Sequence, residues 1–238
     1  MIKVEIVPIL SDNYSYILQH GGDVAVVDPG DGRAVLTALE DRALTATKIF
    51  ITHHHSDHIA GITEIKQAHR CAVYGPAAEA ASIPALDHML DDGDAVRIGG
   101  EAGLVMATPG HTLGHIAFWF AESGLLFAGD TLFSLGCGRL IEGTAEQMYA
   151  SLDRLRDLPD DTKLYCGHEY SLANANFALS LDPNNQALLD KIAQLKKLRA
   201  NNVPTLPATL GAEKALNPFL TSKSAAEFAS LRRLKDVF

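Results

Sequence analysis

The stretch KIFITHHHSDHIAG, from Lys48 to Gly61, places four histidines and an aspartate within six residues, directly after a short apolar run. The apolar run, residues 49–51, predicts a strand, so the histidines begin where that strand ends. Alternate side chains of an extended segment point to opposite sides. We therefore expect His53 and His55 to project to one point and His54 to project away from it.

Asp57 and His58 follow at the turn into a predicted helix and add two metal-binding groups. An expression tag does not explain the run because it is internal, and a solvated loop has no reason to use imidazole so often. Imidazole and carboxylate together bind zinc, iron or manganese, whereas calcium prefers oxygen ligands alone. The stretch therefore predicts a transition-metal site.

Three more candidate ligands each follow a predicted apolar strand, where a rigid sheet can hold them. They are His111 in TPGHTLGH, Asp130 in FAGDT and His168 in YCGHEY. Together with the first cluster they exceed what one tetrahedral ion can bind, so two ions that share a bridging carboxylate fit better. The predicted ligands are His53, His55, Asp57, His58, His111, Asp130 and His168.

Three nearby residues receive other roles. His115 follows His111 by four residues, but the Gly and Pro around them make a shared helical face improbable. We expect His115 to pack against or orient a neighbour and His54 to support the ligands. Cys166, which alternates with Leu164 in a predicted strand, is expected in the core.

Short β-branched runs between turn residues fill most of the chain up to residue 130 and predict strands. Apolar residues at helical spacing predict helices over 31–44 and 58–70. A third helix begins at Thr144, which can form a capping box with Gln147. The stretch TKLYCGHEY, residues 162–170, contains one more predicted strand, which ends at His168.

Beyond Tyr170 the pattern becomes helical, over residues 184–202 and 224–238, with a proline-rich connection over 203–220. The sequence therefore predicts an α/β fold with a smaller helical region appended.

The composition excludes several classes of protein. With 238 residues, of which 47% are hydrophobic, the chain can bury a core without disulfides. Its 29 acidic and 20 basic residues give a net charge of -9, which disfavours nucleic acid as a partner. Three cysteines without C-x-x-C spacing indicate a reducing compartment, and no apolar run is long enough for a membrane span. We expect a cytoplasmic protein.

The motifs THHHSDH, PGHT, GDT and CGHEY, in this order, resemble the metallo-β-lactamase superfamily. The blocks DNYSYIL, GCGRLIEGTAEQMYASL, LYCGHEYSLANANFA, ALNPFL and LRRLKD resemble the glyoxalase II family, over nearly the whole chain. This resemblance implies a four-layer αββα sandwich. It also implies a catalytic domain over 1–169, a helical substrate-binding domain over 170–238, and a dinuclear site between them.

The resemblance further implies two divalent ions, with zinc expected and iron or manganese as alternatives. It assigns one ion to His53, His55 and His111, the other to Asp57, His58 and His168, and the bridge to Asp130. The implied reaction is hydrolysis of S-D-lactoylglutathione and other S-2-hydroxyacylglutathiones to a 2-hydroxy acid and glutathione, in methylglyoxal detoxification. Hydroxide generated at the two metals is the attacking group, and Asp57, His58 and Asp130 are the implied catalytic residues.

For the glutathione part of the substrate, the resemblance implies Arg139, Tyr170, Arg232 and Lys235. Arg232 and Lys235 are three residues apart in the last predicted helix, so the two cations share a face. Where some family members have an aromatic residue, this chain has Ile141, so one contact to the tripeptide is expected to be missing. The helical end is also short for the family. A monomer is expected.

Several alternatives remain within the superfamily: a persulfide dioxygenase with one iron, a lactonase, a β-lactamase and an RNA-processing nuclease. The negative charge disfavours the nuclease, and the absence of a secretion signal disfavours the β-lactamase. A metal-binding or redox protein without turnover is the alternative from another class.

Overall fold

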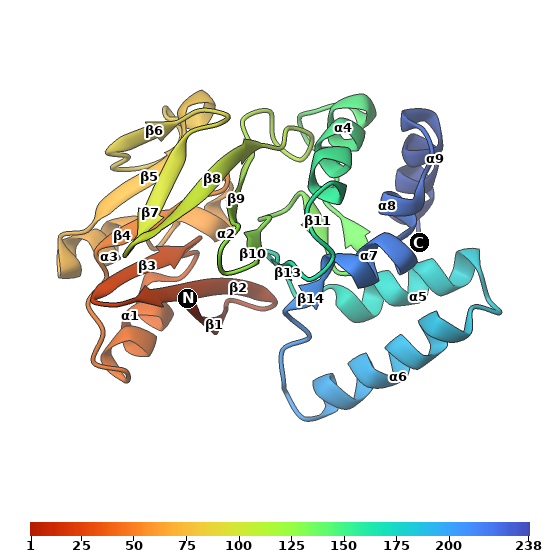
Figure 1. Cartoon of the computed structure of the whole chain (residues 1–238), viewed down its shortest axis with the longest axis horizontal. Helices are drawn as coiled ribbons and strands as arrows, with labels where there is room; N and C mark the ends of the chain where they lie inside the picture. Colours follow the sequence, from red (N-terminus) through yellow and green to blue (C-terminus); the bar gives the residue numbers. More distant parts are fainter.

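Two β-sheets pack face to face and carry helices on both outer sides (Figure 1). The computed structural model describes all residues, 1–238. The first sheet has the strand order β1-β2-β3-β4-β5-β6 and the second β14-β13-β10-β9-β8-β7. The first sheet consists of β1 (Lys3–Ile9), β2 (Asn13–His20), β3 (Asp23–Val27), β4 (Lys48–Phe50), β5 (Ala72–Pro76) and β6 (His88–Leu90). The second consists of β7 (Ala95–Ile98), β8 (Glu101–Ala107), β9 (Ile116–Phe120), β10 (Leu125–Phe127), β13 (Lys163–Tyr165) and β14 (Ala208–Thr209).

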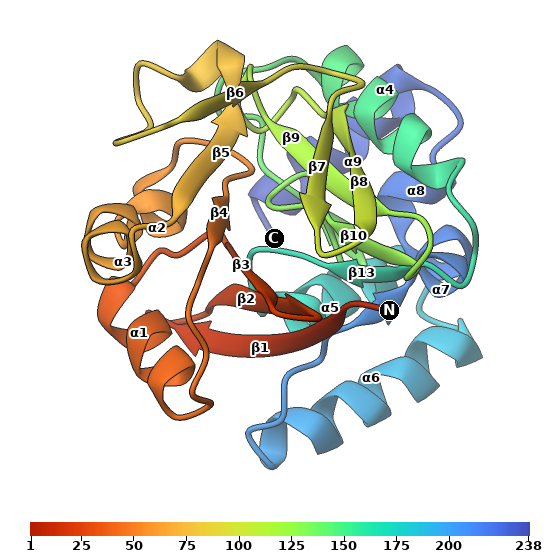
Figure 2. The ribbon, with the colours of Figure 1, turned by 60° about the vertical axis from the view of Figure 1, so that its left-hand side comes forward.

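The helices lie on either side of this pair of sheets. Figure 2 shows α1 and α3 outside the first sheet, with α4 and α8 beyond the second. A small pair, β11 (Leu132–Phe133) and β12 (Gly136–Cys137), precedes α4. The helices are α1 (Gly32–Glu40), α2 (Ser56–Ile59), α3 (Ile62–His69), the 3₁₀ turn η1 (Ala77–Glu79), α4 (Ala145–Arg156), α5 (Ser171–Leu181), α6 (Gln186–Ala200), α7 (Leu210–Leu216), α8 (Pro218–Thr221) and α9 (Ala225–Asp236).

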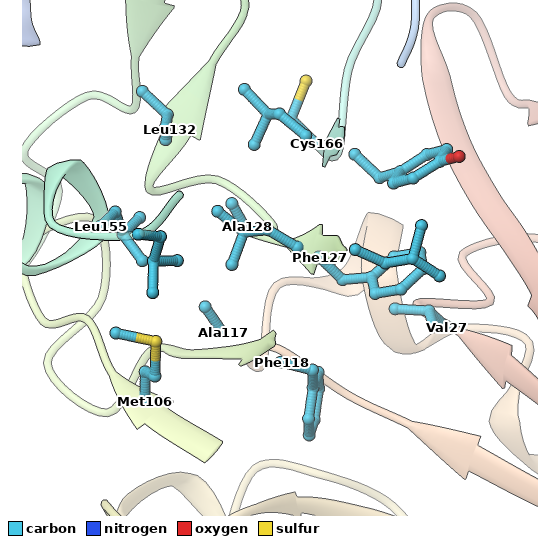
Figure 3. Packing of buried hydrophobic residues seen from close by; sticks show 14 of the residues in the cluster. Val27, Met106, Ala117, Phe118, Phe127, Ala128, Leu132, Leu155 and Cys166 are labelled. Carbon is cyan, nitrogen blue, oxygen red and sulfur yellow. The ribbon is translucent and has the colours of Figure 1, made fainter. Parts of the chain in front are cut away.

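Strand alternation divides the buried residues between two layers. In β2, Tyr16 and Leu18 belong to the core between the sheets, whereas Ile17 faces the layer under α1 and α3. Phe118 and Phe127 of the second sheet belong to the same cluster as Val27 of the first. Figure 3 shows the Phe127 side chain beside Val27. This pattern is what a sheet buried on both faces requires.

The opposite face of the second sheet packs against α4. Leu155 of α4 lies beside Met106, Ala117 and Ala128 (Figure 3). The helix begins as its sequence predicts, because the Thr144 side chain accepts from the Gln147 amide and the Gln147 side chain accepts from the Thr144 amide. The expected four-layer αββα sandwich is therefore confirmed.

The helix predicted over residues 58–70 is interrupted and forms α2 and α3. The break falls at Gly61, whose amide donates to the Pro29 carbonyl. A Cβ at Gly61 would lie 2.5 Å from the backbone nitrogen of Gly32 at the start of α1. The turn between α2 and α3 can therefore lie against the start of α1 only because residue 61 has no side chain.

The C-terminal part contains more helix than its sequence predicts. The proline-rich connection includes α7 and α8, whose first turns are capped by Thr209 and Asn217. In α9, Phe228 is buried, whereas Leu234 is 53% exposed.

This C-terminal part is joined to the body by shared packing. Strand β14 pairs with β13 at the edge of the second sheet. Phe177, Phe219 and Phe228 belong to the same hydrophobic cluster as the core between the sheets. The division into residues 1–169 and 170–238 stays a prediction about domains, and the shared core favours unfolding as one unit.

We predict that Phe228→Ala lowers the free energy of unfolding by about 3–5 kcal/mol, because a fully buried aromatic side chain leaves a cavity. Urea unfolding followed by the fluorescence of Trp119, in the second sheet, and by helical circular dichroism should shift together. Leu234→Ala, on the same helix but exposed, is the control and should change stability by less than about 0.5 kcal/mol. Two separate transitions in the Phe228→Ala protein would contradict a shared core.

Candidate metal centre

The predicted ligands come together where strands of the two sheets end. The His-rich loop follows β4, which is parallel to β3, and the Asp130 and His168 loops follow β10 and β13, which are parallel to each other. His111 lies in the connection between β8 and β9. Parallel strands bring their carboxyl ends to one edge of a sheet, and ligands collect there.

His53, His55 and His111 form one group, with their potential ligand atoms within 4.8 Å of one another. Nε2 of His53 lies 3.2 Å from Nδ1 of His55, and Nε2 of His111 lies 3.0 Å from the same atom. The other ring nitrogen of His111 donates to the carbonyl of Arg139 at 2.8 Å, which fixes the ring with Nε2 toward the group.

Asp57, His58 and His168 form a second group of the same kind. Two carboxylates outside the group orient its rings. Nδ1 of His58 lies 3.1 Å from Oδ2 of Asp28, and Nδ1 of His168 lies 2.8 Å from Oδ1 of Asp12. Both rings therefore direct Nε2 into the site.

Asp130 lies between the two groups. Its Oδ2 is 3.4 Å from Nε2 of His111 in the first group and 3.2 Å from Nε2 of His168 in the second. Its Oδ1 is 3.5 Å from Nε2 of His58. A single carboxylate thus contacts rings of both groups, as a bridging ligand must.

Two glycines permit this close approach. A Cβ at Gly167 would lie 2.3 Å from Oδ1 of Asp130, and a Cβ at Gly30 would lie 1.8 Å from the carbonyl oxygen of Asp57. Any larger residue at either position would displace a ligand-bearing loop.

The charge states differ between the groups. Burial lowers the pKa of His53, and the neighbouring imidazoles lower it further, while burial also lowers the pKa of His111. Burial opposes protonation of His58 too, but Asp130 and Asp28 outweigh it and raise its pKa to about 9. Burial likewise opposes ionisation of Asp130, but the surrounding histidines outweigh it and hold its pKa well below the usual range.

This donor set fits divalent metal ions. Oδ1 of Asp130 and Nε2 of His58 are buried and have no hydrogen-bond partner. Buried polar atoms in native proteins are normally satisfied, and a shared cation would satisfy both. The mixture of imidazole nitrogen and carboxylate oxygen suits zinc, iron or manganese.

A cavity of about 420 Å³ opens onto this centre. Its walls include members of both groups together with all four predicted glutathione-binding residues. These four are Arg139, Tyr170, Arg232 and Lys235. Ile141, Phe133 and Asn174 complete much of the remaining wall.

The four residues are not equally available to a ligand. Arg232 is 5% exposed and donates to the Cys137 carbonyl and to Asp236. Lys235 instead lies over the rings of Phe177 and Phe238 and forms no ion pair, and the exposed Arg139 side chain forms none either.

Tyr170 stacks on His168 with ring centroids 4.7 Å apart. Burial and the nearby carboxylates, beginning with Asp12, raise the pKa of Tyr170 to about 12. The phenol therefore remains protonated at neutral pH and can donate a hydrogen bond into the cavity.

The residues expected to support the ligands do so. His115 is fully buried, stacks on His53, and accepts from the backbone amide of Asp130 at 3.1 Å. His54 points away from His53 toward Glu79. Cys166 is a core residue.

Sequence reasoning missed the carboxylates and the amide that hold the second group. Asn13 donates to Oδ2 of Asp57 at 2.8 Å, beside Asp12 and its contact to His168. The signal for both lay in the DNYSYIL block, and the signal for Asp28 lay in VVDPG at the end of a strand.

Two family models match the chain. Residues 10–168 match the metallo-beta-lactamase superfamily, and residues 169–238 match the C-terminus of hydroxyacylglutathione hydrolase. A hydroxyacylglutathione hydrolase of Methylococcus capsulatus is 44% identical over 254 residues, covering 100% of this chain and 99% of the relative. One of Pseudomonas savastanoi pv. phaseolicola is 47% identical, with 100% of both chains covered.

Solved structures share the fold. ETHE1 from Myxococcus xanthus aligns with a TM-score of 0.74 at 26% identity, covering 98% of this chain and 90% of that one. The BLEG-1 B3 metallo-beta-lactamase aligns with a TM-score of 0.72 at 24% identity, covering 92% and 100%, which shows the fold alone.

Full-length similarity to the relatives, together with the fold and the order of the motifs, gives one conclusion: the chain belongs to the metallo-β-lactamase superfamily and, within it, to the hydroxyacylglutathione hydrolases.

Proposed function

We propose that this chain hydrolyses S-D-lactoylglutathione and related S-2-hydroxyacylglutathiones to the 2-hydroxy acid and glutathione. The observation that carries the proposal is the single cavity that joins both ligand groups to Arg139 and Lys235. The thioester of such a substrate needs the metal centre, and its charged tripeptide needs cationic side chains close to that centre.

The metal ligands in this proposal are the seven that the sequence indicates. His53, His55 and His111 would hold one ion, Asp57, His58 and His168 the other, and Asp130 would bridge them. When bound, such a pair of cations lowers the pKa of water toward neutrality and polarises a carbonyl group. Zinc is the expected ion, with iron or manganese as alternatives.

The protein's own residues then orient the reactants. Asp57, held by Asn13, would accept a hydrogen bond from the attacking water and direct it. His58 and Asp130 would keep their places through Asp28 and the His115 contact to the backbone of residue 130. The leaving group is a thiolate, whose parent thiol has a pKa of about 8.5, so no strong general acid is required.

The cavity also suits the tripeptide. A glutathione thioester carries two carboxylates, and Arg139 and Lys235 are cations without acidic partners. Charge-assisted hydrogen bonds to a carboxylate are roughly twice as strong as neutral ones. Tyr170 can donate one more bond, whereas Ile141, 51% exposed at the rim, offers only apolar contact. Arg232 is buried and already paired, so it would act mainly by shaping the cavity wall rather than by binding a carboxylate.

We further propose that the enzyme is a cytoplasmic monomer. Its three cysteines are free and buried, as suits a reducing compartment. None of its helices has the length and apolar character to cross a bilayer.

Turnover should require bound metal. Purified protein incubated with S-D-lactoylglutathione should release thiol, and prior removal of metal with a chelator should abolish the release. Added zinc, iron or manganese should restore it. Thiol release that persists after complete metal removal would contradict the proposal, and oxygen uptake in place of thiol release would favour the dioxygenase.

Replacing the bridging residue should remove both ions. Asp130→Ala should lose both metals and reduce kcat/KM by about 10³-fold or more, because several kcal/mol of transition-state stabilisation depend on them. Metal content by mass spectrometry and thiol release are the measurements. Asp161→Ala, at an exposed carboxylate outside the site, is the control. An Asp130→Ala protein with two tightly bound metals and full turnover would exclude the bridging role.

Lys235→Met should mainly raise KM. Methionine keeps contact with Phe177 and Phe238 but removes the charge, and a charge-assisted hydrogen bond contributes about 1.5–3 kcal/mol, or about 10- to 100-fold. The kcat should stay nearly unchanged because the proposal assigns Lys235 to the glutathione part of the substrate and not to the thioester. Lys223→Met, at an exposed lysine between α8 and α9, serves as the comparison. A fall in kcat with unchanged KM would argue against this role.

A further inference from the structure

Glu79 is a buried carboxylate close to the metal centre but outside both ligand groups. It ends the η1 turn that follows β5, on the first sheet, and is only 6% exposed. A buried charge of this kind is costly unless it is paired or fully hydrogen-bonded.

Its two oxygens serve two different loops. Oε2 accepts from the backbone amide of His54 at 2.6 Å and lies 2.9 Å from Nδ1 of the same residue. Oε1 accepts from Oγ1 of Thr112 at 2.5 Å and from the amide of Gly114 at 3.0 Å. One carboxylate thus ties the loop after β4 to the loop between β8 and β9.

These are the two loops that supply the first ligand group. His54 lies between His53 and His55, and Thr112 directly follows His111. The group is therefore assembled from both sheets, and the separation of the two loops sets the separation of its nitrogens. The tie is tight, because a Cβ on Gly114 would lie 2.5 Å from Cγ of Glu79.

Glu142, a second and more exposed carboxylate, also connects these two loops. Oε1 of Glu142 lies 3.3 Å from Nε2 of His54, and Oε2 accepts from the amide of Leu113 at 2.9 Å. His54 thus lies between two carboxylates, both of which also contact the His111 loop.

We propose that Glu79 is a positioning residue that sets the affinity of the first ligand group for its metal. It touches neither the ligand nitrogens nor the cavity, and it acts by fixing the distance between the His53–His55 segment and His111. The inference rests on the proposed metal site.

The contacts require a carboxylate. Every group that hydrogen-bonds to the Glu79 side chain acts as the donor, so both side-chain oxygens must be acceptors, as they are in a carboxylate. In Glu79→Gln, the side-chain NH₂ would face the backbone N–H of either His54 or Gly114. Two donors would then face each other, and the hydrogen bond to one of the two loops would be lost. The isosteric change therefore disrupts the tie without opening a cavity.

The test compares Glu79→Gln with Glu101→Gln. Glu101 is also buried, at 1% exposure, and accepts from the amide and hydroxyl of Ser123 without contacting a ligand loop. Metal-free protein is titrated with zinc against a competing chelator, so that the two binding steps are resolved. A His55→Ala protein identifies the step that belongs to the first group. Cobalt absorption reports the ligand geometry.

Glu79→Gln should weaken the first-group step by about 10- to 100-fold and alter the cobalt spectrum, while the other step and the Glu101→Gln protein stay near wild type. Unchanged affinities and spectrum in Glu79→Gln would overturn the proposal. A wild-type protein that binds no metal would instead overturn the site itself. If Glu79→Gln does not fold, Thr112→Val removes one donor alone and should weaken the same step several-fold; wild-type affinity there would also overturn it.

Discussion

The burial of the Asp130 carboxylate between two sets of histidines is the constraint on which the rest of the site depends. An ionised carboxylate removed from water is tolerated only with strong partners. Here the partners are imidazoles from three separate loops, at 3.2 to 3.5 Å, which is at or beyond the usual limit for a hydrogen bond. Cations between these groups would resolve both the charge and the unsatisfied atoms, so the arrangement is that of a metal centre rather than an ordinary ion-pair network.

In this fold, the core fixes the ends of the strands, and separate carboxylates fix the loops that follow them. The sandwich core, filled by residues such as Phe118 and Phe127, holds the strand ends in fixed positions. The loops beyond those ends are then held by carboxylates: Asp28 and Asp12 orient the second group, and Glu79 ties the loops of the first. Preorganisation of this kind leaves little reorganisation for the moment of reaction. The C-terminal helices complete the cavity with Tyr170 and Lys235.

The sequence predicted most strands, the capped helix α4 and the clustering of all seven candidate ligands, because each of these has a local signal. Apolar runs that end in His or Asp place ligands at strand ends whatever the detailed packing. The sequence marks Asp28 at a strand end and Asp12 in DNYSYIL, but it does not name their partners, since Asp28 lies 30 residues from His58 and Asp12 lies 156 from His168. Their roles exist only after the sheets have paired. Helices α7 and α8 were not predicted, because the prolines over residues 203–220 indicated an irregular connection. Asn217 followed by Pro218 is nevertheless a good helix start.

The most direct test of the account is a crystal structure of the metal-loaded protein with anomalous diffraction at the absorption edge of the bound metal. The account predicts two peaks, one among His53, His55 and His111 and one among Asp57, His58 and His168, with the Asp130 carboxylate in contact with both. A single peak, or an Asp130 side chain turned away from the metals, would contradict it.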